Sequence, residues 1–318
     1  MQFEADLEAA RARIADGIVR TPVWRSDDLD AALGREVWLK CEPLQRTGSF
    51  KLRGATNAVR ALPAGVHGVV AVSSGNHAQA VAYAGRAAGL PVTVVMNADA
   101  NAAKRAATVG YGATVVSDGV DPTNREEIAR DLAEREDLAF VHPFDDWNVI
   151  AGQGTATLEL LEDVPGLDAV VTPIGGGGLL SGAALACRDA SPGTRVYGAE
   201  PAASPDAQRS LAEGRRVRLD YAPSTISDGA RTVQIGERTF AVLSELCAGI
   251  SLVNDDAARA AMALVWDTTK LLIEPTSALA IAAIAAGSVP GERVGVVLSG
   301  GNVDAAVLAA TIRVEESV

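Results

Sequence analysis

Cysteine, histidine and aromatic residues are scarce in this sequence. Its 318 residues include three cysteines, three histidines and 4% aromatic residues. The cysteines, Cys41, Cys187 and Cys247, lie far apart, which argues against a disulfide framework and a cysteine-based metal cluster. The first residues, MQFEADLEAARARI, predict a charged amphipathic helix and not a signal peptide. We therefore expect a protein of the reducing cytoplasm.

Excess positive charge and membrane-spanning patterns are also absent. The 28 basic and 40 acidic side chains give a net charge of −12, and no long basic stretch suggests a nucleic-acid partner. Two long runs carry no charge. Glycines and a proline interrupt Ala169–Cys187, which predicts a strand, a loop and a helix start, and Pro275–Gly291 reads as a buried helix. Neither run predicts a membrane segment.

Short β-branched runs alternate with helical patterns along nearly the whole chain. HGVVAVSS precedes NHAQAVAYAGRAAG, and LDAVVTPI precedes LLSGAALACRDA. This alternation predicts an α/β protein with two open parallel sheets flanked by helices. Residues 68–145 are predicted to form a small domain, inserted into a large discontinuous domain of residues 1–67 and 146–318. Ligands of open α/β sheets bind where strands end, so functional residues are expected in those turns.

A lysine at the start of a predicted helix, Lys51 in RTGSFKLRGA, is the first candidate functional residue. Ser49 is the predicted N-cap, and Leu52 and Val59 follow with helical spacing. The positive end of the helix dipole disfavours an ammonium group in the first turn. Lys51 is therefore either a solvated surface lysine or an amine whose lowered pKa lets it attack a carbonyl.

The turn VSSGNHAQA, residues 72–80, leaves a predicted strand and opens a helix. Its serines, glycine and asparagine would present several N–H groups in one concavity, which suits a carboxylate or a phosphate. An ordinary turn capped by Ser74 or Asn76 would explain the same residues. His77 alone is weak evidence of function.

The turn PIGGGGLLSG, residues 173–182, has four successive glycines before a predicted helix. Such a turn lets a ligand approach the backbone closely, and the helix start favours a phosphate. The glycines also resemble a dinucleotide-binding turn, with Glu200 about twenty residues on as a ribose-binding acid. Ser181 stands where that motif requires its third glycine, so a dinucleotide-dependent oxidoreductase is the weaker alternative.

A third turn, VLSGGNVD, follows a buried-type strand and places Ser299 at the predicted ligand edge of the sheet. Its hydroxyl there would bond one heteroatom of a flat ring. A nucleophilic lysine, a phosphate-binding loop and a hydroxyl that faces a ring nitrogen are together consistent with one ligand, pyridoxal phosphate.

Six motifs resemble those of the fold-type II pyridoxal-phosphate enzymes, in the family's order and over nearly the whole chain. They are GSFKLRGA, SSGNHAQA, HPFDDWNVIAGQGT, GGGGLLSG, LLIEPTSALA and LSGGNVD. The similarity is to the branch of threonine/serine dehydratases and serine racemase. It implies a fold like that of the tryptophan synthase β subunit. It also implies β-elimination, in which a β-hydroxy amino acid such as L-threonine or L-serine gives a 2-keto acid and ammonia.

The resemblance assigns roles to individual residues. Lys51 would carry pyridoxal phosphate as a Schiff base and act as the general base, and Ser74 would face it across the cofactor plane. Phe50 would pack beneath the ring, Asn76 would bond its 3′ oxygen and Ser299 would meet its nitrogen.

Two further sets of residues are implied for anionic groups. Backbone N–H groups would bind the phosphate at Gly175, Gly176, Gly177, Gly178 and Leu179. The substrate carboxylate would be bound by Ser73, Asn76 and His77.

Other positions bear on reaction type and on a metal. Phe144 stands where serine racemase has a polar residue, which favours a dehydratase. Glu200 and Asp206, with the carbonyl of Ser204 between them, match positions that hold a divalent cation in some members. The ion would be Mg²⁺ or Ca²⁺, and solvated loop acids are the alternative.

The substrate stays open among threonine, serine, 3-hydroxyaspartate and a bulkier β-hydroxy amino acid. Serine racemase and hydroxyaspartate dehydratase are alternatives within the family. A catalytically silent amino-acid-binding or assembly subunit is an alternative outside the enzymes. We expect a homodimer that takes a small amino acid, with neither a nucleic acid nor a membrane as partner.

Overall fold

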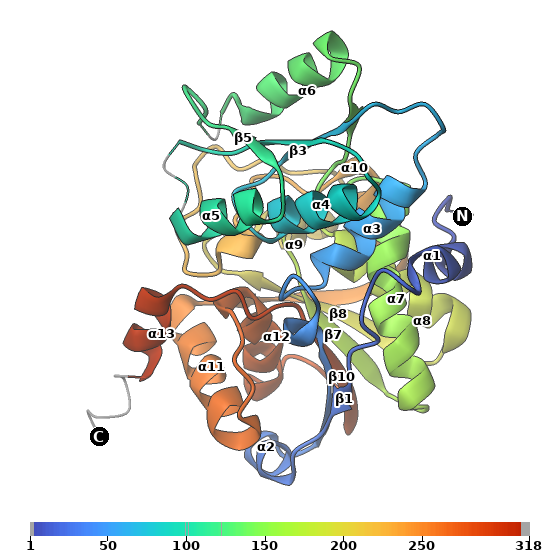
Figure 1. Ribbon diagram of the computed structural model, residues 1–318. Coiled ribbons are helices and arrows are strands. Elements are labelled where there is room, and N and C mark those ends of the chain that lie inside the picture. Colours follow the sequence, from blue (N-terminus) through green and yellow to red (C-terminus); the bar gives the residue numbers. More distant parts are fainter. Residues whose placement is uncertain (1–2, 99, 101, 122, 313–318) are drawn as a thin grey trace.

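The computed structural model describes all residues except 1–2, 99, 101, 122 and 313–318. It contains two β-sheets with helices on both faces (Figure 1). The strand order is β1-β2-β10-β7-β8-β9 in the six-stranded sheet and β5-β4-β3-β6 in the four-stranded sheet. The prediction of an α/β fold with two parallel-sheet domains is therefore confirmed.

The six-stranded sheet is parallel except at one edge, where β1 pairs antiparallel with β2. Its strands are β1 (Val23–Trp24), β2 (Glu36–Cys41), β7 (Ala169–Pro173), β8 (Arg195–Pro201), β9 (Cys247–Val253) and β10 (Arg293–Leu298). Along β7, Ala169 and Val171 belong to one hydrophobic cluster and Val170 to the cluster on the opposite face. Burial on both faces explains the unbroken apolar runs in the sequence.

Helices cover the six-stranded sheet in two layers. One hydrophobic cluster includes residues of α2 (Asp27–Leu33), α11 (Asp255–Thr269) and α12 (Pro275–Ala285). The other includes residues of α1 (Leu7–Ile14), α7 (Trp147–Asp163), α8 (Gly178–Ala190), α9 (Asp206–Glu213) and α10 (Glu237–Leu246). The short helices η1 (Glu42–Leu44) and η2 (Asp228–Ala230) lie in connections, and α13 (Ala305–Ile312) packs on α11.

The four-stranded sheet is wholly parallel. Its strands are β3 (Val69–Val72), β4 (Val92–Val95), β5 (Thr114–Val116) and β6 (Ala139–Phe140). Its helices are α4 (Asn76–Ala87) and α5 (Ala102–Gly110), which lie side by side, and α6 (Arg125–Arg135) on the opposite face (Figure 1). All four strands fall within the predicted small domain. The domain boundaries stay a prediction, because α3 (Lys51–Arg60) shares a hydrophobic cluster with β3 and α4.

Glycines let α3 and α7 approach each other closely. A Cβ placed on Gly152 would lie 2.6 Å from the Cα of Gly54 and 2.7 Å from the carbonyl oxygen of Arg53. The Gly54 N–H donates to Gln153 Oε1 at 3.1 Å, which joins the two helices at the same point. The start of α3, where Lys51 lies, is thereby held at a fixed place on α7.

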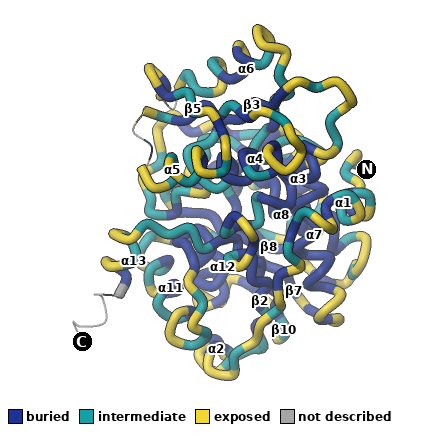
Figure 2. Tube along the Cα trace, viewed as in Figure 1, coloured by how far each residue is buried: buried dark blue, intermediate teal, exposed yellow. Residues whose placement is uncertain are grey.

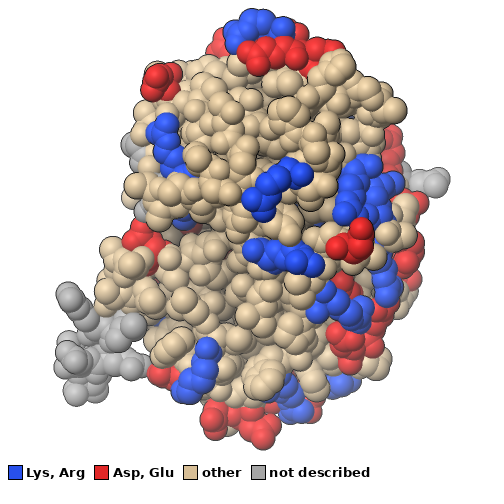
Figure 3. All heavy atoms as spheres, in the orientation of Figure 1, with Lys and Arg blue, Asp and Glu red and all other residues tan. Residues whose placement is uncertain are grey.

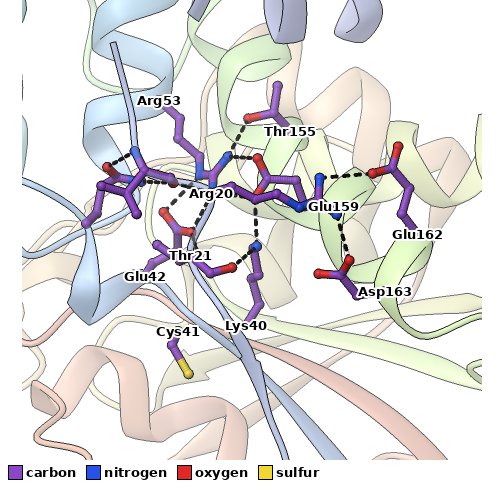
Figure 4. Close-up of polar contacts among 12 residues, drawn as sticks. Arg20, Thr21, Lys40, Cys41, Glu42, Arg53, Thr155, Glu159, Glu162 and Asp163 are labelled. Carbon is purple, nitrogen blue, oxygen red and sulfur yellow. Dashed lines mark hydrogen bonds and ion pairs between the residues drawn. The ribbon is translucent and has the colours of Figure 1, made fainter. Parts of the chain in front are cut away.

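Arg53 of α3 is the centre of a buried cluster of charges (Figure 4). Arg53 is 0% exposed, and its guanidinium donates to both oxygens of Glu42 and both oxygens of Glu159, at 2.8 to 2.9 Å. Lys40 pairs with Glu159 at 2.6 Å and donates to the Thr21 carbonyl at 2.5 Å. Although burial acts to raise it, the hydrogen bonds and charges of Arg53 and Lys40 hold the pKa of Glu159 below its usual value. The cluster joins β2, η1, α3 and α7.

The exposure of each element follows its place in these layers. Buried residues concentrate in β3, β7, β8 and β10 and in α7, α8 and α12, whereas α2 and α6 are exposed along their outer sides (Figure 2). On the face drawn in Figure 3, acidic and basic side chains are interspersed at the two ends of the molecule. No helix in the described part of the chain is long and apolar enough to cross a membrane.

Gly152→Ala should lower the free energy of unfolding by about 2 to 3 kcal/mol, because the new methyl group would meet backbone atoms of α3 that cannot move aside alone. Gly110→Ala is the matched control. A Cβ there has nothing within 4 Å, so this variant should be as stable as the wild type or slightly more stable. Urea unfolding measures both, and a Gly152→Ala protein of unchanged stability would contradict the close contact.

Candidate functional site

The candidate site lies where the segment before α3 meets the segment after β10. Ser49 and Gly300 form an antiparallel bridge, and the Phe50 N–H donates to the Ser299 carbonyl at 2.9 Å. The Gly301 N–H donates to the Gly48 carbonyl at the same distance. These backbone contacts bring Lys51 and Ser299 to one place, although they are far apart in the sequence.

Lys51 is the first residue of α3, and Phe50 occupies the N-cap position without a side-chain cap. The prediction that Ser49 caps this helix is wrong, because its buried hydroxyl has no hydrogen-bond partner. Lys51 Nζ donates to the Pro143 carbonyl at 2.7 Å and lies 5.2 Å from the Phe50 ring centre. Burial lowers the pKa of Lys51 to about 8, an effect that the nearby Glu274 carboxylate reduces in part. Burial, more than the helix dipole, therefore makes the amine available.

The four-glycine loop precedes α8, which begins at Gly178. Gly177 has a φ of 96°, in the left-handed region that favours glycine. A Cβ on Gly176 would lie 2.3 Å from the Phe144 ring, and Thr239 Oγ1 donates to the Gly176 carbonyl at 2.8 Å. The loop is thus fixed by its neighbours. The first N–H groups of α8 have no partner within the helix and suit a phosphate.

Ser299 follows β10 and is 0% exposed, and its hydroxyl has no hydrogen-bond partner. A buried hydroxyl without a partner costs free energy unless a bound ligand supplies its hydrogen bond. The available amine of Lys51, the start of α8 at Gly178 and this hydroxyl together match the aldehyde, phosphate and ring nitrogen of pyridoxal phosphate. The residues present therefore fit this cofactor.

The turn before α4 differs from an ordinary capped turn. Gly75 is the N-cap and makes no side-chain cap bond. Ser73 Oγ accepts the Gly75 N–H at 3.1 Å, and Ser74 Oγ accepts the Asn97 N–H at 3.3 Å. The side chain of Asn76 is bonded to Glu274 instead. The N–H groups of the first turn of α4 are consequently available to an anion such as a carboxylate.

His77 is 3% exposed, and its Nε2 lies 3.1 Å from the Val141 carbonyl. A carbonyl only accepts, so Nε2 carries the proton and the buried Nδ1, which has no partner, is an acceptor. Burial lowers the pKa of His77 to about 3, and the charge of Lys51 acts in the same direction. The neutral ring has no donor for a carboxylate. Any contact of His77 with the substrate carboxylate is left to its backbone N–H.

Glu200, near the end of β8, and Asp206, the first residue of α9, are two buried acids outside the cofactor site. The Glu200 oxygens accept the N–H groups of Ala207 and Gln208 at 2.8 and 2.9 Å, which leaves this acid poorly placed to bind a ribose. Asp206 Oδ1 accepts from Ser204 at 3.4 Å, whereas Oδ2 is buried without a partner.

Burial raises the pKa of both Glu200 and Asp206. The pKa of Glu200 lies well above its usual value, and that of Asp206 is raised to about 7. Both side chains are buried, so they are not solvated loop acids. No group of three or more His, Cys, Asp or Glu side chains in the described residues is arranged for a metal ion. The metal site at Glu200, Ser204 and Asp206 stays a prediction.

The sequence interpretation gave no role to Glu274, which the structure places in the site. It is 2% exposed, and both its oxygens accept from Asn76 Nδ2. Burial raises the pKa of Glu274 to about 7, whereas its hydrogen bond with Asn76 lowers it in part. The sequence did contain a signal for this role: in LLIEPTSALA an acid stands directly before a proline at a helix start.

Only Phe144 of the loop 142–146 was singled out from the sequence, but the whole loop organises the site. Its Pro143 carbonyl receives the Lys51 hydrogen bond. Asp145 accepts the N–H groups of Glu237 and Arg238 at the start of α10, at 3.0 and 2.8 Å. Asp146 caps α7 by accepting the Val149 N–H at 2.9 Å. One short loop thus fixes the acceptor of Lys51 and the starts of two helices.

Comparisons with known proteins show the family to which the chain is similar. A family model described as pyridoxal-phosphate dependent enzyme matches residues 14–300. The serine racemase of Dictyostelium discoideum is 43% identical, with 94% of this chain and 94% of the relative covered. The L-threo-3-hydroxyaspartate ammonia-lyase of Saccharomyces cerevisiae is 44% identical, with 94% and 93% covered. The solved structure of a threonine deaminase from T.th. has a TM-score of 0.91 and 48% identity, with 95% of this chain and 99% of that chain covered.

The lowered pKa of Lys51 predicts how the cofactor-free protein takes up pyridoxal phosphate. Because the amine and not the ammonium attacks an aldehyde, the uptake rate should rise with pH and level off above about 8. A lysine of ordinary pKa would keep the rate rising toward about 10.4. Stopped-flow absorbance measures the rate. After borohydride reduction, peptide mass spectrometry should find the cofactor on Lys51, and its attachment to another lysine would contradict the assignment.

Proposed function

The chain belongs to the fold-type II pyridoxal-phosphate-dependent enzymes, and from this premise we propose that it dehydrates and deaminates a β-hydroxy amino acid to a 2-keto acid and ammonia. The observation that carries the proposal is the Ser299 hydroxyl, which is buried and has no protein partner. A hydroxyl is neutral, so it does not hold a proton on a ring nitrogen as a carboxylate would.

The electronic consequence of Ser299 favours elimination over transamination. Pyridoxal phosphate, when bound, supplies the sink for the electrons left on the substrate Cα. The Ser299 hydroxyl would give its ring nitrogen a neutral hydrogen bond, so this electron sink would be weaker than one whose nitrogen a carboxylate keeps protonated. With the weaker sink, loss of the β-hydroxyl would be favoured over reactions that need a long-lived negative charge on the substrate Cα.

Two further groups of the chain would carry out the reaction. The Lys51 amine, whose pKa burial lowers to about 8 in the cofactor-free protein, would take the α-proton as the general base. The N–H groups at the start of α4 hold the substrate carboxylate and so orient the α-proton toward Lys51. Phe144 packs over Gly176 and keeps that side of the glycine loop apolar, which supports a dehydratase.

Racemisation is the second candidate, and Ser74 is the observation that favours it. Its hydroxyl accepts the Asn97 N–H at 3.3 Å and retains its own proton for a second partner. Racemisation needs a proton donor on the face opposite Lys51, whereas elimination from one enantiomer needs a single base. The relatives include both a serine racemase and a hydroxyaspartate ammonia-lyase, so both activities belong in the test.

A panel of L-threonine, L-serine and L-threo-3-hydroxyaspartate tests the proposal. The loaded enzyme should release keto acid and ammonia in equal amounts from at least one of them, and Lys51→Ala should lose this activity. Ser74→Ala should reduce D-enantiomer formation more than keto-acid release. Keto acid is measured by coupled absorbance and the enantiomers by chiral chromatography. Formation of D-enantiomer without keto acid would replace the proposal by the second candidate, and no product from any substrate would refute both.

We also propose that Glu200 and Asp206 bind Mg²⁺ or Ca²⁺, because both acids are buried and Asp206 Oδ2 has no hydrogen-bond partner. Mg²⁺ should then raise the melting temperature, by about 1 to 2 °C for each kcal/mol of binding free energy. Asp206→Asn should remove the shift, whereas Glu134→Ala, at an exposed position on α6, should keep it. Differential scanning calorimetry measures it. An equal shift in Asp206→Asn and wild type would reject the site.

A further inference from the structure

The side-chain amide of Asn76 lies between two side chains of the other domain. Its Nδ2 donates to the two carboxylate oxygens of Glu274 at 2.9 and 3.0 Å, and its Oδ1 accepts from Asn302 Nδ2 at 2.9 Å. Asn76 begins α4 beside the four-stranded sheet. Glu274 precedes α12, and Asn302 follows β10 of the six-stranded sheet. The three residues bridge the two domains inside the candidate site.

These contacts allow only one orientation of the Asn76 amide. Above its pKa of about 7 the Glu274 carboxylate accepts but does not donate, so it faces the nitrogen of Asn76. Asn302 Nδ2 also donates to the Thr47 carbonyl at 2.8 Å, which fixes its NH₂ group toward Asn76 and requires an acceptor there. In the flipped amide, oxygen would face carboxylate and nitrogen would face nitrogen, and both hydrogen bonds would be lost.

The geometry also leaves one donor of this amide for a ligand. An amide nitrogen carries two hydrogens. The two Glu274 oxygens belong to one carboxylate and lie at nearly equal distances from Nδ2, so they can share one N–H. The second N–H of Asn76 is then left for a further acceptor.

Glu274 itself is held rigidly. Its N–H donates to the Gly300 carbonyl at 3.0 Å, and a Cβ placed on Gly300 would lie 2.9 Å from Glu274 Oε1. It forms no ion pair within the described part of the chain, although Lys51 and Lys104 act on its pKa from α3 and α5. A buried carboxylate without an ion pair is costly, which indicates a role beyond packing.

We propose that Glu274, assisted by Asn302, is a positioning residue for the cofactor. It holds the Asn76 amide so that an N–H, and not the carbonyl oxygen, meets the 3′ oxygen of pyridoxal phosphate. The proposal rests on the cofactor of the family and not on the substrate proposed above.

Glu274→Gln tests the proposal because it keeps the volume of the side chain. The new NH₂ group replaces one oxygen that faces Asn76 Nδ2, so a charged acceptor is lost and the flipped amide becomes accessible. The affinity of the cofactor-free protein for pyridoxal phosphate should fall roughly fivefold. In an Asn76→Ala background the same substitution should change the affinity less than about twofold, because Glu274 acts through Asn76. Absorbance titration without substrate measures all four proteins.

Two measurements separate positioning from a general structural effect. Glu134→Gln on the exposed side of α6 is the control and should leave the affinity unchanged. The side-chain ¹H–¹⁵N resonance of Asn76, identified by its disappearance in Asn76→Ala, should shift in Glu274→Gln and stay in Glu134→Gln. This second measurement decides the question if Asn76→Ala binds the cofactor too weakly to titrate.

Unchanged affinity in Glu274→Gln, an equal loss in both backgrounds, or an unmoved Asn76 resonance would overturn the proposal. Because no substrate is present, these outcomes are independent of which amino acid the enzyme converts.

Discussion

A guanidinium group that is cut off from water must have its N–H groups satisfied within the protein, and Arg53 meets this demand with two carboxylates. This need decides how α3 packs, because only one side of the helix can face Glu42 and Glu159. Lys51 precedes Arg53 by two residues, which places the two side chains about 200° apart around the helix axis. The anchor on one side of α3 therefore directs Lys51 to the other side, toward the Pro143 carbonyl.

Close backbone contacts fix the position of α3, whose orientation the ion pairs of Arg53 determine. The side-chain-free faces of Gly54 and Gly152 bring α3 and α7 together, and Phe144 packs directly over Gly176. A side chain at any of these glycines would separate elements that carry functional groups. The site thus depends on the buried charges, which fix the orientation of α3, and on these glycines, which fix the distances between elements.

Much of the fold and part of the site could be predicted from the sequence, and the reasons are physical. Strands buried on both faces leave unbroken apolar runs, and Lys51, the glycine loop and Ser299 stand in short contiguous motifs. Features that depend on distant partners left no local signal. The burial of Arg53 by residues as distant as Glu159 required the fold, and so did the tautomer of His77. The predicted cap at Ser49 was wrong, because Ser49 forms a backbone bridge with Gly300 and α3 begins only at Lys51.

The loop 142–146 also makes the two connections between the sheets unequal, because it fixes contacts that the other connection lacks. The other connection, residues 63–67, is mostly exposed and carries no helix cap. New chain termini placed in that first connection, as in a circular permutation, would leave every contact of the site intact. One residue inserted into the second connection would displace the acceptor of Lys51 and two helix starts together. Length variation among descendants of this chain is therefore expected at the first connection and excluded at the second.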